Sequence, residues 1–430
     1  MRRKAIVFLA TVSVVCLSAI CMLWHKGQKT DDGLKKRKEE SMTQRNAEQG
    51  AVQEIKQKLA QQKWVVTEDI QGSMGPNLSL AGRFLLEEGG SLFVAGLYLD
   101  AAVAVYGGED VPEKETYNIY CLKDGIWEVF ASHPPESTGN GIIERHNNYD
   151  ETFIQNMVYH DGFLYYDVLY DDDPSIGGDK MMFIYRIPVQ GGKAEELALS
   201  YERFSFYNGK IYYAGTEKVR WSQEDVFWEM EPDGTGRREI YRRNENMSYK
   251  RLFTVGGGCL YVEDKKGMTV VNLETGDRKH YKAAWENMKY LYYQAGCLYF
   301  LVDYGMTSSI YRMNIISCKT EKLAESVDAA WLEGGYLYYI WYDSVGEKLN
   351  LSVFDLETKQ SFTEELEEPV ISTPYLQTVG DDILVDMQVY DEYKYKEYLF
   401  EVEKYVYYKY GSNTLQLERL DRQEVPAENP

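Results

Sequence analysis

The hydrophobic residues of this chain recur in a short phrase that returns, with variations, along most of its length. Each copy is a turn that ends in Gly, followed by an aliphatic residue and then by aromatic residues. Self-similarity at a regular spacing predicts a repeat architecture. The clearest copies are Asp161-Gly162-Phe163-Leu164-Tyr165-Tyr166, Asn208-Gly209-Lys210-Ile211-Tyr212-Tyr213, Gly258-Cys259-Leu260-Tyr261, Gly296-Cys297-Leu298-Tyr299-Phe300 and Gly335-Tyr336-Leu337-Tyr338-Tyr339.

The spacing of these turns matches one kind of repeat. After Gly162 the intervals are 47, 49, 38 and 39 residues, with a weaker copy at Gly380. A four-stranded propeller blade takes about 40–50 residues. The first interval, from Gly90 to Gly162, is 72 residues long and is expected to hold one blade with insertions near 107–114 and 132–151. The pattern predicts a β-propeller of seven four-stranded blades, with six or eight as alternatives.

The local sequence predicts strands on both sides of each turn. Asp-Gly and Asn-Gly pairs favour two-residue type I′ hairpins, in which both central residues have positive φ. The residues after them are apolar at successive positions, which is typical of strands that are covered on both faces. Further strands follow in each unit, such as Ile184–Ile187, Ile310–Met313 and the run at Lys322-Leu323. No amphipathic helical stripe is present from about 85 to 425, so we expect an all-β domain.

This succession of turns and strands resembles the β-propellers of low-density-lipoprotein-receptor type (YWTD-like). It is most similar to their bacterial relatives, a family of unknown function common in Gram-positive anaerobes. The clearest copy joins Asn208–Tyr213 to Asp233-Gly234-Thr235, and the resemblance covers most of residues 85–420. The receptor motif has Tyr-Trp followed by Thr-Asp, whereas this chain has Tyr-Tyr followed by varied residues. The resemblance implies the fold and gives no support to a receptor-like ligand, because fold does not imply function.

A propeller must also close its ring. The sequence offers two candidate strands for completing the last blade, near residues 405–420. They are Trp64–Thr67 and Arg83–Leu86.

The amino terminus predicts a membrane anchor. Basic residues in Met1–Lys4 precede 20 uncharged residues, Ala5 to Trp24. Twenty residues at about 1.5 Å each can cross a hydrocarbon core of roughly 30 Å. A cleaved signal peptide is the alternative. Neither Cys16 nor Cys21 follows a small residue, as a lipoprotein signal requires, and no small-x-small cleavage site follows Trp24. We therefore expect residues 1–24 to form an uncleaved signal anchor with one transmembrane helix.

The polar segment 25–63 is expected to form a charged, partly helical stalk. It carries more positive charge than the residues before the span, and the positive-inside rule would keep it cytoplasmic. A long following domain, however, translocates largely regardless of charge. We therefore expect a single-pass protein of the cell membrane, with the propeller over 64–425 outside the cytoplasm and a short tail over 426–430.

Charge excludes one class of partner. Residues 1–63 contain 13 basic and 6 acidic side chains, a balance of +7, so the remainder of a chain with net charge −21 carries −28. An acidic domain repels phosphate backbones, and we expect no nucleic-acid partner. The basic stalk suits anionic lipid headgroups instead.

The cysteines and most tyrosines of the repeats are expected to be packing residues. Cys121, Cys259, Cys297 and Cys318 match no zinc-binding spacing. Cys259 and Cys297 occupy the same position in neighbouring repeats, where we expect small buried hydrophobes and no disulfide. Most of the 37 tyrosines are expected to fill the spaces between blades.

Candidate chemistry is sparse. The sequence lacks the usual metalloprotease, hydrolase, dinucleotide and phosphate-loop motifs, and nothing in it calls for a cofactor. His133, Glu144 and His146 share one long insertion and are the weak catalytic candidates, because long loops are often functional. A solvated or disordered loop is the alternative.

A second weak candidate is an acidic loop. Asp171, Asp172, Asp173 and Asp179 surround Pro174–Gly178, and hard cations such as Ca²⁺ bind several oxygens on a flexible turn. The segment lacks the register and terminal Glu of a calcium-binding hand, so a solvated acidic loop is the expected alternative.

Together these features predict an extracytoplasmic, membrane-anchored propeller that binds or scaffolds an envelope glycan, peptide or protein. One alternative is a carbohydrate-active or other hydrolytic propeller with its site at the central channel. Another is a sensor partner of a membrane signalling protein.

Overall fold

The structure is a computed structural model of the 430-residue chain. The chain divides into two units, Met1–Lys58 and Leu59–Pro430, and every described residue belongs to the second. The expected anchor (1–24), stalk (25–63) and tail (426–430) lie outside the described residues. The residues described are 85–88, 90–134, 149–172, 181–215, 225–243, 252–264, 267–282, 288–303, 308–333, 335–343, 348–366, 375–379, 382–395, 398–411 and 417–420.

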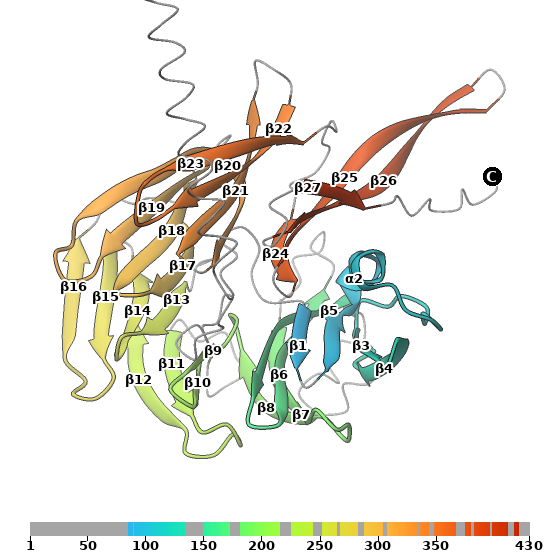
Figure 1. Ribbon diagram of the computed structural model, residues 1–430. Coiled ribbons are helices and arrows are strands. Elements are labelled where there is room, and N and C mark those ends of the chain that lie inside the picture. The colour runs from blue at the N-terminus through green and yellow to red at the C-terminus, as the bar shows by residue number, and fades with distance from the viewer. Residues whose placement is uncertain are drawn as a thin grey trace, which may run out of the picture. The chain divides into compact units, whose positions relative to one another are not determined.

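The described part of the chain is nearly all β, in six antiparallel sheets built from consecutive strands (Figure 1). The first sheet contains β1 (Leu85–Glu88), β2 (Ser91–Ala95), β3 (Asn118–Lys123) and β4 (Ile126–Ser132). The second contains β5 (Tyr149–His160), β6 (Phe163–Asp172), β7 (Met181–Pro188) and β8 (Glu195–Ser200). The third contains β9 (Ser205–Tyr207), β10 (Lys210–Gly215), β11 (Asp225–Met230) and β12 (Arg238–Arg243). The fourth contains β13 (Phe253–Gly256), β14 (Cys259–Asp264), β15 (Gly267–Asn272) and β16 (Arg278–Lys282).

The fifth sheet has seven strands because one strand serves two groups. It contains β17 (Met288–Gln294), β18 (Cys297–Asp303), β19 (Ser308–Asn314), β20 (Thr320–Glu333), β21 (Tyr336–Asp343), β22 (Lys348–Asp355) and β23 (Ser361–Leu366). The first half of β20 pairs with β19, and its second half, from Val327, pairs with β21. Between the halves Ser326 has a φ of 55°. The sheet therefore consists of two four-stranded groups that share β20.

The sixth sheet corrects the expected closing strand. It contains β24 (Tyr375–Val379), β25 (Asp382–Tyr395), β26 (Tyr398–Gly411) and β27 (Leu417–Leu420). These four strands complete it, and the candidate Arg83–Leu86 does not pair with it: Leu85 and Leu86 begin β1 and pair with β2. The other candidate, Trp64–Thr67, lies outside the described residues.

The first strands of the sheets lie beside one another. β1 contacts β5, β9 contacts β13, β13 contacts β17, and the second half of the fifth sheet reaches the sixth through β20 and β24. β24 also contacts β1, so the last sheet adjoins the first.

The predicted hairpin turns are confirmed. Asp161 and Gly162 have φ values of 46° and 80°, and Asn208 and Gly209 have 49° and 72°. Both residues of each pair are therefore in the left-handed region that a type I′ turn requires.

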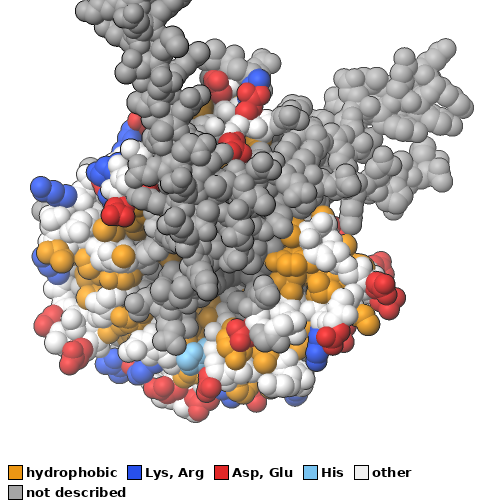
Figure 2. Space-filling view, in the orientation of Figure 1, with side chains coloured by type: hydrophobic (Ala, Val, Ile, Leu, Met, Phe, Trp, Pro, Cys, Tyr) orange, Lys and Arg blue, Asp and Glu red, His pale blue; other side chains and the backbone are white. Residues whose placement is uncertain are grey.

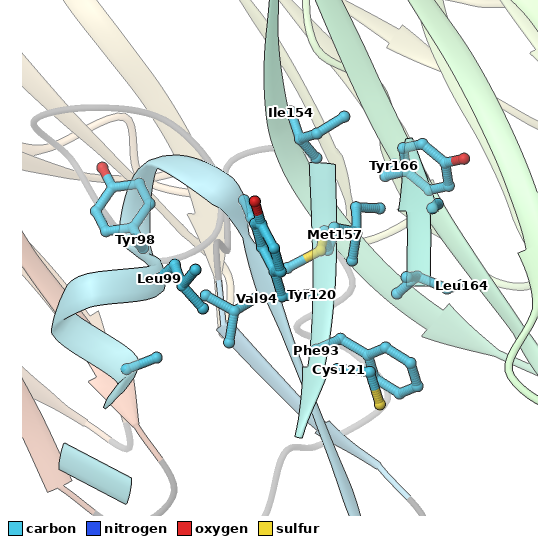
Figure 3. Packing of buried hydrophobic residues seen from close by; sticks show 14 of the residues in the cluster. Phe93, Val94, Tyr98, Leu99, Tyr120, Cys121, Ile154, Met157, Leu164 and Tyr166 are labelled. Carbon is cyan, nitrogen blue, oxygen red and sulfur yellow. The ribbon is translucent and has the colours of Figure 1, made fainter. Parts of the chain in front are cut away.

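Burial on both strand faces is confirmed too. In β10 five consecutive residues, Ile211 to Gly215, are buried; β18 also has five in succession and β14 has four. Tyrosines fill much of the interior, and Tyr166 and Tyr338 are completely buried. Figure 3 shows this packing between the first two sheets, where Met157 of β5 reaches toward Tyr120 of β3.

The all-β prediction is wrong at one place. The connection between β2 and β3 contains a 3-10 turn, η2 (Gly96–Tyr98), and a helix, α2 (Leu99–Tyr106). The sequence of α2, LDAAVAVY, has a single charged residue, so it shows no alternation of polar and apolar faces. Tertiary packing of Leu99, Ala101 and Ala102 supports the helix instead.

Candidate functional site

The candidate site is an exposed apolar patch on the first sheet. The described residues include six large hydrophobic side chains that are strongly exposed, and four belong to this sheet and its β2–β3 connection. We call them the first-sheet patch: Leu97, Val111, Ile126 and Val129, which are 39, 44, 49 and 46% exposed. Contiguous exposed apolar side chains commonly mark an interaction surface; here the bridge between Glu109 and Ile126 brings the segment that carries Val111 beside β4.

The patch lies along an edge strand. β4 is the last strand in the order of the first sheet, and its side chains differ in burial: Trp127 and Ala131 are buried, whereas Ile126, Glu128, Val129 and Ser132 are exposed. Ile126 and Val129 are exposed, whereas Trp127 between them is 2% exposed and donates from Nε1 to Gly107 O at 2.7 Å. Packing of the indole thus anchors β4 at Trp127.

Part of this edge already accepts a strand. Glu109 forms a parallel bridge with Ile126, and its N–H donates to Gly125 O at 2.8 Å. The N–H of Trp127 in turn donates to Glu109 O at 3.0 Å. Val111 follows two residues after this bridge. Among the described residues no strand pairs with the rest of the outer edge of β4.

Figure 2 shows one face of the molecule with its side chains coloured by type. Hydrophobic side chains gather on the right of the view, in the region of α2 and β1. Acidic and basic side chains are interspersed over the remaining periphery. The face shown therefore carries no large area of a single charge.

His133, the described catalytic candidate, is buried. It follows β4, is 7% exposed, and its Nε2 is hydrogen-bonded to Tyr166 Oη at 2.7 Å. The ring lies between Tyr166 and Tyr185, with centroids 5.4 and 4.6 Å away. Burial lowers the pKa of His133 to about 4 and raises that of Tyr166. His133 is thus a neutral packing residue, and Glu144 and His146 lie outside the described residues.

The acidic loop is described only at its start. Asp171 and Asp172 are the last residues of β6, so they belong to a strand rather than to the expected loop. Asp173 and Asp179 lie outside the described residues. Within the described ranges no group of three or more His, Cys, Asp or Glu side chains is arranged to hold a metal ion.

Arginines tie neighbouring sheets together. Arg186 of β7 binds Glu195 within its own sheet and donates from Nη1 to Pro232 O of the third sheet at 3.2 Å. Arg238 binds Glu229 and reaches Leu273 O of the fourth sheet at 3.3 Å.

Arg312 of β19 makes the same kind of tie. Its Nε donates to Glu321 at 2.6 Å and its Nη1 to Leu356 O, in the next group of strands, at 3.3 Å. These charged side chains therefore connect neighbouring groups of strands.

One pair of this kind is fully buried. Arg243 and Asp225 are 2% and 5% exposed, with Nε to Oδ2 at 3.1 Å. Arg243 Nη1 also donates to Glu263 O of the fourth sheet at 2.6 Å.

Sequence reasoning missed Asp167. This carboxyl is completely buried in β6. The signal was present, because Asp167 is the only charged residue in the apolar run Phe163–Tyr170.

The described cysteines are all free. Cys259 and Cys297 each begin the second strand of their group and are half-buried, as their repeat position predicts.

Sequence comparisons assign no family. No protein-family model and no curated protein matches the chain. Within the described residues no helix is long and apolar enough to cross a membrane.

Solved structures do match, and they are β-propeller proteins. One is a prolyl endopeptidase, with a TM-score of 0.47 and 11% identity over 90% of this chain and 56% of that one. Another is Sqt1 from Saccharomyces cerevisiae, with a TM-score of 0.40 and 10% identity over 78% and 82%. A third is TolB from Acinetobacter baumannii, with a TM-score of 0.36 and 10% identity over 79% and 78%. This chain spans little more than half of the endopeptidase. At these identities and scores the matches assign neither a family nor an activity.

Proposed function

We propose that this chain is a seven-bladed β-propeller that acts as a binding or scaffolding module for a protein or peptide partner. Seven groups of four strands support the blade number, if the two groups that share β20 are counted separately. The contact between β24 and β1 supports closure of the ring.

The observation that carries the binding role is the first-sheet patch. Two of its members, Ile126 and Val129, lie on an edge strand whose outer side is open beyond Trp127 in the described part of the chain. Unpaired N–H and C=O groups on a strand edge can pair with an extended segment of another chain, and nearby apolar side chains add specificity. We therefore propose that a partner segment adds to β4 and covers this patch.

The inter-sheet ties support a scaffolding role. A binding surface loses less entropy on association when the elements that carry it are already fixed. Arg186 and Arg238 each hold one sheet to a carbonyl of the next, and Arg312 holds one four-stranded group of the fifth sheet to the other. The ties give the module a rigid frame.

We further propose that residues 5–24 anchor the protein in the cell membrane and that the propeller faces outward, toward the envelope. The uncharged run in the sequence supports the anchor. Protease treatment of intact cells tests the orientation. We expect release of a compact fragment that contains residues 64–430. A fragment protected until the membrane is permeabilised would place the propeller in the cytoplasm.

The binding role is tested by immunocapture of the full chain from its own cells after cross-linking. The variant Ile126→Ser with Val129→Ser removes exposed methyl groups without touching the interior. The matched control is Ile316→Ser, since Ile316 is 89% exposed in the β19–β20 turn.

We expect the wild type and the control to capture the same partner in equal amounts. The double variant should capture at least about tenfold less of it, which corresponds to a loss of about 1.4 kcal/mol in binding free energy. Equal capture by all three proteins, at equal thermal stability, would contradict the proposal.

A further inference from the structure

A second feature of the fold lies between the second and third sheets, around Asp167. Asp167 is 0% exposed, and neither carboxylate oxygen has a hydrogen-bond partner among the described residues. In the sheet it pairs with Gln155 of β5 and Ile184 of β7. Two positions before it, Tyr165 packs against Phe206 of the third sheet, with ring centroids 5.3 Å apart. Since alternate residues of a strand share a face, Asp167 faces the third sheet as well.

Asp167 lies beside the connection from β8 to β9, which contains Arg203 and Phe204. Asn156, at a bulge in β5, donates from Nδ2 to Phe204 O of this connection at 3.3 Å. Asn156 has a φ of 33°, a left-handed conformation that costs a non-glycine residue free energy. Its Oδ1 is buried without a partner in the described part of the chain. Asp167 and Asn156 thus line one polar spot in an apolar junction.

The charges around this spot do not neutralise Asp167. Arg203, on the same connection, is the charged group that acts on it and favours ionisation, as does the backbone N–H of Phe204. The packed neighbours Ile184, Phe204 and Phe206 carry no charge. Other titratable side chains on these elements are Tyr201 and Glu202 of the β8–β9 connection, together with Tyr165, Tyr213 and His160, whose ring lies 4.6 Å from that of Phe206.

An ionised carboxylate in an apolar interior is costly when its charge is compensated only in part, and such a group ordinarily takes up a proton instead. Burial raises the pKa of Asp167 well above its usual value, and Arg203 only partly opposes this. A neutral carboxyl also gains an O–H, which the nearby unpaired Oδ1 of Asn156 can accept.

We propose that Asp167 is a proton-dependent latch: protonated, it holds the β8–β9 connection against β5, and ionised, it loosens the junction between the second and third sheets. The raised pKa of a folded-state acid sets the sign. The stabilisation is fully present below the ordinary carboxyl pKa and is lost as the pH rises through the raised value. The junction is therefore tightest in acidic surroundings. This inference is independent of the partner proposed above.

The test is hydrogen exchange of the full chain, followed by mass spectrometry over residues 200–207 from pH 4 to pH 9. Rates are divided by the intrinsic rate at each pH to give protection factors. Coupling to one proton changes protection by at most about tenfold per pH unit. We expect protection in wild type to fall toward high pH, by tenfold or more in total.

Asp167→Asn mimics the neutral acid, so we expect high protection that does not vary with pH. The matched control is Asp161→Asn in the exposed turn, where Asn208 occupies the equivalent position of the next repeat. It should keep the wild-type profile.

Two results would overturn the latch. One is a flat wild-type profile, which needs no variant and stands even if Asp167→Asn fails to fold. The other takes one of two forms. Protection in Asp167→Asn is equally reduced at every pH, or the protection of the wild type at high pH rises when Ca²⁺ or Na⁺ is added. Either form of the second result would mean that an ionised Asp167 has a partner or binds a cation.

Discussion

At the residue scale, the chain buries ionisable groups in contrasting ways. Arg243 and Asp225 are buried as a pair, with a backbone carbonyl satisfying another guanidinium N–H. His133 is buried as a neutral ring against Tyr166. Each arrangement removes an uncompensated charge from the interior, and each responds differently to substitution and to pH.

Substitution of Arg243 tests the buried pair. Arg243→Met leaves Asp225 buried without its partner, and removing one member of such a pair costs about 3–5 kcal/mol. We expect a large fall in the denaturant midpoint. Lys348→Met breaks the exposed pair with Glu365 and should cost no more than about 1 kcal/mol. Equal effects of the two substitutions would refute a special role for Arg243.

The pH dependence tests His133. Its pKa falls from 6.5 unfolded to about 4 folded, so neutral His133 contributes stability above pH 6.5 that is lost as the pH falls toward 4. The loss is about 3 kcal/mol at most.

When the urea midpoint of unfolding is plotted against pH, His133→Phe should flatten the acidic part of the curve. Tyr166→Phe removes the hydrogen-bond partner and keeps the titrating ring, so it should retain the slope. An unchanged slope in His133→Phe would show that other groups cause it.

At the element scale, local patterns determine the strands and turns, and these were predictable. Paired positive φ at Asp161-Gly162 follows from the residue types, and successive apolar residues in β10 reflect burial on both faces. The helix α2 was not predictable, because its all-round apolar sequence has no period and packing decides its conformation. The shared strand β20 was also not predictable, since a bend at Ser326 links two sheets where turns usually separate them.

The candidate site was less accessible from the sequence than the fold. Histidines and acidic loops attracted attention by residue type, yet His133 proved to be a core residue. The exposure of Ile126 and Val129 depends on how β4 packs as the edge strand of its sheet, and a single strand sequence does not reveal that. Asp167 alone was visible, as a charge inside an apolar run.

The inter-sheet ties yield a prediction at this scale. Arg312→Lys keeps the charge and loses the planar fork that reaches both Glu321 and Leu356 O. A hydrogen bond of this kind contributes about 1 kcal/mol. We expect hydrogen exchange in the turn at 355–360 to quicken severalfold.

Arg242→Lys provides the control, because Arg242 pairs with Glu239 three positions away on its own strand. It should leave that turn unchanged. An unchanged exchange rate at residues 355–360 in Arg312→Lys would show that Arg312 does not stabilise this turn.

At the scale of the whole molecule, acidity and rigidity fit a solvent-facing platform. A net charge of −21 disfavours polyanionic partners and leaves apolar edges as the means of specific contact. In the proposal, the first-sheet patch supplies such an edge, and the arginine ties connect sheets elsewhere in the molecule.

Photocross-linking in living cells is the most direct test of this account. A photoreactive amino acid replaces Ile126 in one full-length protein and Ile316 in another, both exposed positions on different sheets. We expect a discrete adduct from position 126 and none from position 316, and protease added to intact cells should release that adduct on the compact fragment that contains residues 64–430. No adduct at position 126, or the same adducts at both positions, would contradict a partner bound at the edge of the first sheet.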